Sequence, residues 1–149
     1  MLKNEPAFFR CFNPNELTIE STKLFYVDVR KEEWKLETLA DLIEYSNITQ
    51  AVVYCSNLKR VNQVVSFLKS KEFSVCTEDS LPEFRTGSSR IIVVTDSLPF
   101  QRFDGVTLTV SFDCPPCGES LMKRCGRSGC FGRRGLHVLF LAEDELLRL

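Results

Sequence analysis

The stretch from Lys123 to Gly135 combines residue types that bind anions. Its thirteen residues hold five cations and four glycines, and the glycines recur at every third position from Gly126. Each interior glycine costs a helix about 1 kcal/mol relative to alanine, so a continuous helix is not expected here. Arginine side chains on such a loop present planar pairs of donors that match phosphate. The stretch therefore predicts an anion-facing loop, with a solvated basic loop as the alternative.

Two further groups of polar residues directly follow apolar runs. Ser56 and Asn57 come directly after the apolar run at residues 50–55. Thr95 is the last residue of the run at 90–95, and Asp96 follows it. Ligands of open α/β sheets bind outside the carboxyl ends of the strands, so these residues are candidates for a binding site. Each group also has a plainer interpretation, because Ser56 or Asn57 can cap a helix and Asp96 can form a turn.

The elements that must position these residues alternate between strands and helices. Apolar and β-branched runs predict strands at 22–29, 50–55, 73–76, 90–95, 106–112 and 136–142. Periodic apolar stripes predict helices at 32–45, 58–68, 115–123 (one or two turns) and 143–149. This order predicts an α/β fold with a mostly parallel sheet and helices on both faces. Residues 1–16 have the composition of a linker-like arm, and residues 17–149 show no further domain boundary.

The connection after the strand at 73–76 is short. Fourteen residues separate Cys76 from Ile91, close to the minimum of about a dozen for a parallel crossover. The segment from Thr77 to Glu83 also contains Pro82. A loop with little or no helix, and a poorly covered sheet face or edge, is therefore expected here.

Composition sets limits on the kind of protein. The chain has 149 residues, 44% of them hydrophobic, and a formal net charge of −1, so binding of phosphate must be local. No run approaches the roughly 18 apolar residues of a membrane span, and the first fifteen residues do not resemble a signal peptide. Seven cysteines, an odd number, argue against a disulfide framework. A cytoplasmic or nuclear protein in a reducing compartment, without membrane contact, is expected.

Several local sequences, in the right order over roughly residues 5–149, resemble the second RecA-like domain of DEAD-box RNA helicases of the initiation factor 4A type. Lys123–Gly135 is similar to the arginine-finger motif His-Arg-Ile-Gly-Arg-x-Gly-Arg-x-Gly, with Arg124, Gly126 and Arg127 at matching positions. The sequences ITQAVVYCSN at 48–57, FRTGSSR at 84–90 and Thr95-Asp96 resemble motif IV, the Phe-Arg-x-Gly segment and the opening of motif V.

The resemblance implies a single RecA-like domain and a set of site residues. Arg127 would be the catalytic arginine finger when a first domain is present, and Arg124 and Arg127 would bind nucleotide. The residues implied in RNA binding are Ser56, Asn57, Arg85, Gly87, Thr95 and Asp96. The resemblance implies partners of three kinds: single-stranded RNA backbone, a helicase first domain or a helical-repeat scaffold protein.

The chain departs from the family in ways that bear on activity. It contains neither the phosphate loop Gly-x-x-x-x-Gly-Lys-Ser/Thr nor Asp-Glu-Ala-Asp, so it supplies neither the nucleotide cradle nor the acid that holds Mg²⁺. Cys130 replaces the second phosphate-facing arginine, and a thiol cannot donate a forked pair of hydrogen bonds. Motif V continues as SLPFQRFD at 97–104 and does not match, so roles for Arg102 and Asp104 are not inferred.

Two hypotheses follow from these matches and departures. The first is an RNA- or protein-binding module that has no ATPase activity of its own and needs no cofactor alone. The alternative is the second half of an ATP-dependent RNA helicase, whose phosphate-loop domain lies on another polypeptide or was cut off. ATP and Mg²⁺ would enter only in that case.

Two other residue sets have minor functional interpretations. Cys114 and Cys117 have the spacing of a zinc knuckle, and Cys125 and Cys130 follow nearby, so four thiolates could hold Zn²⁺. Free cysteines that behave as small hydrophobic residues are the preferred interpretation, and no metal site is predicted. His137 is the sole histidine and is expected to be an outward-facing or hydrogen-bonded core residue rather than a catalyst.

Overall fold

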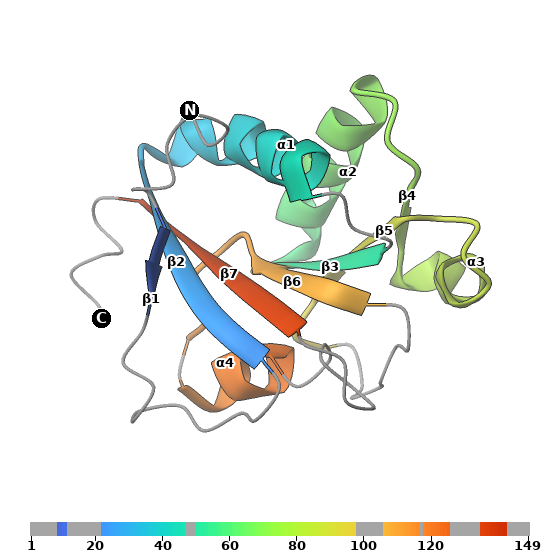
Figure 1. Cartoon of the computed structure of the whole chain (residues 1–149). Coiled ribbons are helices and arrows are strands. Elements are labelled where there is room, and N and C mark those ends of the chain that lie inside the picture. The colour runs from blue at the N-terminus through green and yellow to red at the C-terminus, as the bar shows by residue number, and fades with distance from the viewer. Residues whose placement is uncertain are drawn as a thin grey trace.

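The computed structural model describes residues 9–11, 22–46, 50–97, 106–116, 118–125 and 135–142 (Figure 1). Its strands are β1 (Phe9–Cys11), β2 (Thr22–Arg30), β3 (Gln50–Cys55), β4 (Val75–Thr77), β5 (Ile91–Thr95), β6 (Val106–Ser111) and β7 (Gly135–Ala142). Its helices are α1 (Lys35–Ser46), α2 (Leu58–Ser70), α3 (Leu81–Arg85) and α4 (Gly118–Cys125), with 3-10 turns at Glu32–Trp34 and Glu78–Ser80. No described helix is long and apolar enough to cross a membrane.

The strands form one sheet in the order β1-β2-β7-β6-β3-β5-β4. β2 to β7 are mutually parallel, whereas β1 pairs with β2 in the antiparallel direction, with Phe9 opposite Val27. The predicted α/β class with a mostly parallel sheet is confirmed. β1 lies within residues 1–16, so part of the segment expected to be a linker-like arm adds an edge strand to the sheet.

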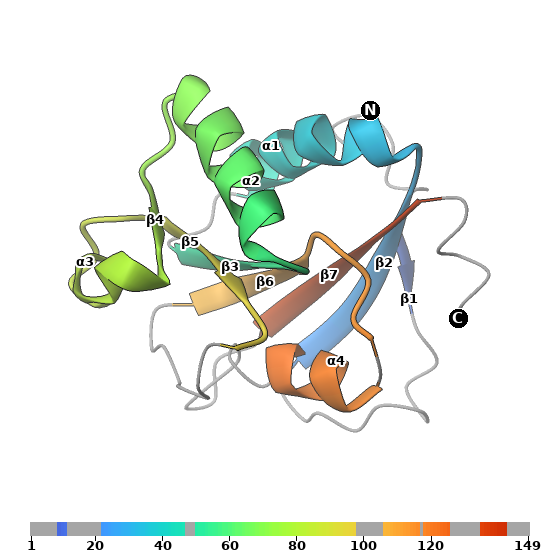
Figure 2. The same cartoon turned by 180° about the vertical axis from the view of Figure 1, so that it is seen from behind.

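Helices cover both faces of the sheet, as predicted. Figures 1 and 2 show α1 and α2 together on one face and α4 on the opposite face. The larger hydrophobic cluster joins α1 and α2 to the sheet through residues such as Leu39, Ile43, Val64 and Leu68, all fully buried. A cluster of this size accounts for the periodic apolar stripes, because each stripe is the buried face of its helix.

Strand β3 lies near the centre of the sheet and is buried on both faces. Ala51, Val53 and Cys55 belong to the cluster beneath α1 and α2, whereas Val52 and Tyr54 belong to a second cluster on the other face. Such a strand has no polar face and reads as a continuous apolar run. The predicted bounds of 50–55 are those observed.

The connection from β4 to β5 differs from the loop expected there. It forms the 3-10 turn at Glu78–Ser80 and the five-residue helix α3, less than three turns in all. Phe84 of α3 is 0% exposed and packs in the second cluster, so this face is covered rather than bare. The Gln50 side-chain amide fixes the connection by donating to the carbonyls of Phe84 (2.6 Å) and Ser89 (3.2 Å). Phe84, together with the partly buried Leu81 of the same helix, thus covers this face of the sheet.

Two predicted segments fall partly or wholly outside the described residues. The glycine-rich stretch contributes only its ends, the last turn of α4 and the first residue of β7, and residues 126–134 lie outside. The helix expected at 143–149 also lies outside. The helix expected within 115–123 is observed as the two turns of α4.

Candidate functional site at the carboxyl edge of the sheet

Polar residues from three neighbouring strands meet at the carboxyl edge of the sheet. β6, β3 and β5 are adjacent, and the residues that follow or end them are Asp113, Ser56 and the pair Thr95 and Asp96. Arg124 reaches the same place from α4. The parallel topology brings these residues together, since parallel strands all end at one edge.

Arg124 is the centre of this arrangement. Its Nε and Nη2 donate to Oδ1 and Oδ2 of Asp96, each at 2.7 Å, and its Nη1 donates to Ser111 Oγ (3.0 Å) and to the carbonyl of Asp113 (2.9 Å). The guanidinium also lies over the ring of Tyr54, 5.3 Å from its centroid. Only 1% of Arg124 is exposed. Its planar fork thus joins the ends of β3, β5 and β6.

This geometry bears on the nucleotide-binding role predicted for Arg124. Four of the five N–H groups of its guanidinium donate to partners within the domain, and the side chain is buried. Its observed role is to join elements of the domain. Nucleotide binding by Arg124 stays a prediction, and Arg127, its predicted companion and the predicted arginine finger, lies outside the described residues.

Asp113 links the end of β6 to the start of α2. Its Oδ2 accepts a hydrogen bond from the backbone N–H of Ser56 at 2.8 Å. Its Oδ1 lies 3.3 Å from Arg60 Nε and 3.8 Å from the Nζ of Lys35, whose side chain is completely buried. A buried carboxylate needs such partners, and here they fix the position of the residues predicted to contact RNA.

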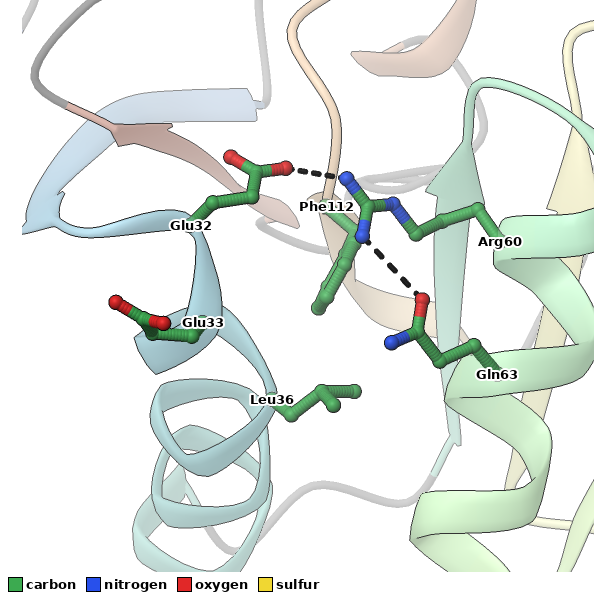
Figure 3. Close-up of a pocket in the computed structure, with 6 residues that line it drawn as sticks. All are labelled: Glu32, Glu33, Leu36, Arg60, Gln63 and Phe112. Atoms are coloured by element: carbon green, nitrogen blue, oxygen red, sulfur yellow. Dashed lines mark hydrogen bonds and ion pairs between the residues drawn. The ribbon is translucent and has the colours of Figure 1, made fainter.

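A pocket of about 360 Å³ opens beside this ion-pair cluster (Figure 3). Arg60 pairs there with Glu32 and donates to Gln63 Oε1 at 3.3 Å. The Arg60 guanidinium also lies over the ring of Phe112, 5.5 Å from its centroid. The remaining lining residues are Glu33 and Leu36. One cation, Arg60, and two carboxylates, Glu32 and Glu33, line this pocket, which sits between the starts of α1 and α2.

His137 is a hydrogen-bonded core residue. This was one of the two expectations for it, and the outward-facing position was the other. It is 0% exposed, its Nδ1 lies 2.5 Å from Thr109 Oγ1, and its Nε2 lies 2.8 Å from Ser111 Oγ. Burial, assisted by the positive charge of Arg124, lowers the pKa of His137 to about 3. The imidazole is therefore neutral at physiological pH.

The residues predicted to bind RNA form two separate groups. Ser56, Asn57, Thr95 and Asp96 lie at the carboxyl edge, where Ser56, Asn57 and Asp96 are exposed. Arg85 and Gly87 lie before β5 begins, so the length of that strand, roughly 15 Å, separates the two groups.

The alternative interpretations of these residues can be compared with their local contacts. Asn57 caps α2, because its Oδ1 accepts from the N–H of Arg60 at 2.9 Å. Thr95 Oγ1 lies 2.6 Å from Ser97 Oγ and forms part of the turn after β5. Gly87 has φ of 85°, a conformation that other residues rarely adopt, although a Cβ there would meet nothing within 4 Å. Glycine at 87 therefore serves the backbone turn.

The cysteines show no metal centre in the described part of the chain. No group of three or more described histidine, cysteine or acidic residues could hold a metal ion. Cys114 is half-buried, and its Sγ lies 3.6 Å from the carbonyl of Pro115. Cys117 and Cys130 lie outside the described residues. Burial raises the pKa of Cys55 far above its usual value, as expected for an inert core thiol.

Several residues of the site were not foreseen from the sequence, namely Lys35, Tyr54, Arg60, Thr109, Ser111 and Asp113. A signal for two of them exists in β6, where Thr109 and Ser111 alternate with apolar residues and therefore share one face. The pairing of β6 with β7 places Thr109 opposite His137. The lone histidine of one strand thus meets the polar face of its neighbour.

Comparison with known sequences finds close relatives of one kind. The chain is 40% identical over 144 residues to the ATP-dependent RNA helicase eIF4A of Schizosaccharomyces pombe, covering 89% of this chain and 36% of the relative. It is also 40% identical over 147 residues to the ATP-dependent RNA helicase eIF4A of Mycosarcoma maydis, covering 91% of this chain and 36% of that relative. The chain thus spans about a third of the length of the curated relatives it matches. No protein-family model matches it.

Solved structures give the same fold. Saccharomyces cerevisiae Dbp5 bound to RNA and ADP BeF3 superposes with a TM-score of 0.78 at 24% identity, covering 92% of this chain and 39% of that one. Dbp5 bound to Gle1 and IP6 superposes with a TM-score of 0.78 at 23% identity, covering 87% of this chain and 38% of that one. The isolated C-terminal domain of the DEAD-box protein Dbp5 superposes with a TM-score of 0.72 at 24% identity, covering 83% of this chain and 78% of that one. The chain belongs to the initiation factor 4A type of DEAD-box RNA helicases, as a C-terminal RecA-like domain.

Proposed function

We propose that this domain binds the backbone of single-stranded RNA at the carboxyl edge of its sheet and has no ATPase activity of its own. The start of α2 carries this proposal. Ser56, Asn57, Leu58 and Lys59 are exposed there, and the backbone N–H groups at a helix start attract phosphate. Asp113 and the Asn57 cap hold this turn in place from within the domain.

The relatives support RNA as the ligand. Dbp5, which shares the fold, has been solved bound to RNA and ADP BeF3. The residues predicted to contact RNA in this chain include four that converge on the carboxyl edge. Arg85 and Gly87, at the other end of β5, would need a second contact with the same strand of RNA, roughly 15 Å away.

The chain's own residues favour a domain without independent ATP hydrolysis. It has no phosphate loop or Asp-Glu-Ala-Asp motif, and Cys130 stands where the family has an arginine. Phosphoryl transfer needs a cradle for the phosphates and a held Mg²⁺. ATP and Mg²⁺ would bind only together with a separate phosphate-loop domain. The protein is expected to act in the cytoplasm or the nucleus.

A second candidate function is that of a complementing helicase half. The observation in its favour is that the relatives are about three times longer than the matched region, which leaves room for a first domain. In that case Arg127 would act as the arginine finger across the domain interface. A protein partner is a further candidate, because Dbp5 has also been solved bound to Gle1.

Titration of a fluorescent single-stranded RNA at two salt concentrations tests the proposal. The informative variants are Asn57→Asp, which adds a negative charge at the start of α2, and Arg127→Ala combined with Arg133→Ala and Arg134→Ala. Arg124 stays unchanged, because its substitution would disturb the fold. Wild type is expected to bind with an affinity that falls as salt rises, and both variants to bind more weakly. Absence of binding by wild type at low salt would refute the proposal.

ATP turnover separates the two candidate functions. The domain alone is expected to hydrolyse no ATP. It should then be mixed with a first domain from an eIF4A relative. Stimulated turnover that is lost in the Arg127→Ala variant would favour the complementing half, whereas RNA affinity unaffected by ATP and the first domain would favour the binding module.

A further inference from the structure

Two buried residues on either side of the glycine-rich segment contact the same hydroxyl group. Arg124 lies two residues before segment 126–134 and His137 lies three residues after it. Nη1 of Arg124 is 3.0 Å from Ser111 Oγ, and Nε2 of His137 is 2.8 Å from the same atom. Both side chains are almost completely buried, with exposures of 1% and 0%. The chain entering the segment and the chain leaving it are thus joined through one residue of β6.

The chemistry of the partners favours one order of donors and acceptors. Arginine can only donate, so Ser111 Oγ accepts from Arg124 and has its own hydrogen available for Nε2 of His137. The neutral ring then carries its proton on Nδ1 and donates it to Thr109 Oγ1, 2.5 Å away. In this order the chain Arg124–Ser111–His137–Thr109 gives both ring nitrogens and the serine hydrogen a partner.

We infer that His137 is a positioning residue, which acts through Ser111 to hold Arg124 against Asp96. The inference rests on the proposed function in so far as the turn at Thr95 and Asp96 binds RNA. Arg124 is the only one of the three that contacts the Asp96 turn, through both carboxylate oxygens. A change at His137 is therefore transmitted to the predicted RNA-contacting turn at Thr95 and Asp96 without any contact between them.

Three substitutions of His137 separate the hydrogen bond to Ser111 from the filling of space. The amide of His137→Gln can reach the position of Nε2 and restore the contact with Ser111. The shorter amide of His137→Asn reaches the position of Nδ1 and keeps only the contact with Thr109. His137→Leu keeps much of the volume and neither bond. Thr107→Val, on β6 with Ser111 and half-buried, is the matched control.

Nitrogen-15 NMR of the imidazole tests the order of the bonds directly. His137 is the only histidine of the sequence, so in a preparation without a histidine tag its ring signals need no assignment. The wild-type domain is expected to show the Nδ1–H tautomer, because the bond made by one nitrogen fixes the state of the other. The Nε2–H tautomer would overturn the proposed order. This measurement uses folded wild type, so it does not depend on any variant being stable.

The second measurement follows the Nε–H of Arg124 and the affinity for RNA. Exchange of that hydrogen with solvent should stay slow in wild type, His137→Gln and Thr107→Val, and become fast in His137→Leu and His137→Asn. RNA affinity should fall roughly five-fold in the latter two, the effect of one lost hydrogen bond, and recover in His137→Gln. Slow exchange in His137→Leu, or unchanged affinity in that variant, would overturn the positioning role.

Failure of the proposed function would look different. If wild type binds no RNA, RNA binding is refuted, and the positioning role is then decided by the tautomer and the Arg124 exchange alone. If wild type binds RNA but Arg124 exchanges equally slowly in every variant, RNA binding stands and the role of His137 does not.

Discussion

The guanidinium of Arg124 meets the carboxylate of Asp96 edge to edge, with Nε–Oδ1 and Nη2–Oδ2 distances of 2.7 Å each. The two residues are 28 positions apart in the sequence and come from α4 and from the turn after β5. Arg124 is buried, whereas the Asp96 side chain is 38% exposed. The pair therefore joins α4 to the turn after β5 at the carboxyl edge of the sheet.

Breaking this pair is expected to destabilise the domain. Arg124→Met removes the donors of Asp96 and Ser111 together, and loss of one partner of a buried pair costs about 3–5 kcal/mol. Asp96→Asn should cost less, because water reaches that side chain. Urea denaturation of both single variants and the double variant would give a coupling free energy of roughly 0.5–3 kcal/mol. Lys59→Met, on an exposed position, is the control, and zero coupling would contradict the prediction.

Phe84 is expected to be the residue on which the short α3 connection depends. It is fully buried in the second cluster, and replacing a buried phenylalanine by alanine costs about 3–5 kcal/mol. Phe84→Ala should lower the urea midpoint and speed amide exchange in β4 and β5 more than elsewhere. Leu58→Ala, at a position that is 65% exposed, should leave both measurements near wild type. An equally small effect of Phe84→Ala would mean that other contacts hold α3.

The two interpretations of Asn57, helix cap and RNA contact, can be separated by charge. Asn57→Ala should lower the free energy of unfolding by about 1 kcal/mol, the usual value of a lost N-cap. Asn57→Asp keeps an acceptor for the Arg60 N–H and should keep stability, but its carboxylate repels phosphate. Urea denaturation and RNA titration of both variants check this. RNA affinity of Asn57→Asp equal to that of wild type would leave only the capping role.

The stability of the domain is expected to depend on pH through His137. Its pKa is about 3 in the fold, against an ordinary value of 6.5, so between these values the unfolded chain binds more protons than the native state. Stability from this residue is thus complete above pH 6.5 and is lost as the pH falls toward 3, with a slope of at most about 1.4 kcal/mol per pH unit.

Comparison of wild type with His137→Gln isolates this effect, because the carboxylates titrate in both proteins. The difference in their free energies of unfolding, measured in urea at several pH values from 7.5 to 4.5, should shift in favour of the variant as the pH falls. A difference that stays constant over this range would show that His137 can be protonated within the fold.

The sheet could be predicted from the sequence because its central strands carry unambiguous patterns. The run from Gln50 to Cys55 has no polar face, and the strand observed there has the same bounds. The carboxyl-edge position of Ser56 and Thr95 then followed from parallel topology alone. The coverage supplied by Phe84 could not be predicted in this way, since a single turn of helix has no periodicity to detect.

The interior of the site was less predictable than its location. Arg124 belongs to a glycine-rich cationic run, a pattern typical of exposed loops, yet its guanidinium is buried. Its burial depends on acceptors from Asp96, Ser111 and Asp113, which adjoin it only after the strands have paired. The register between β6 and β7, which places Thr109 opposite His137, is likewise a property of the folded sheet.

The two outermost strands of the described sheet, β1 and β4, are each only three residues long. Each of these two strands offers a neighbouring chain only a short template for backbone pairing. Short borders of this kind protect a sheet from edge-to-edge aggregation. The apolar strands β3, β5 and β7 lie between them, and each is paired with a neighbouring strand on both sides.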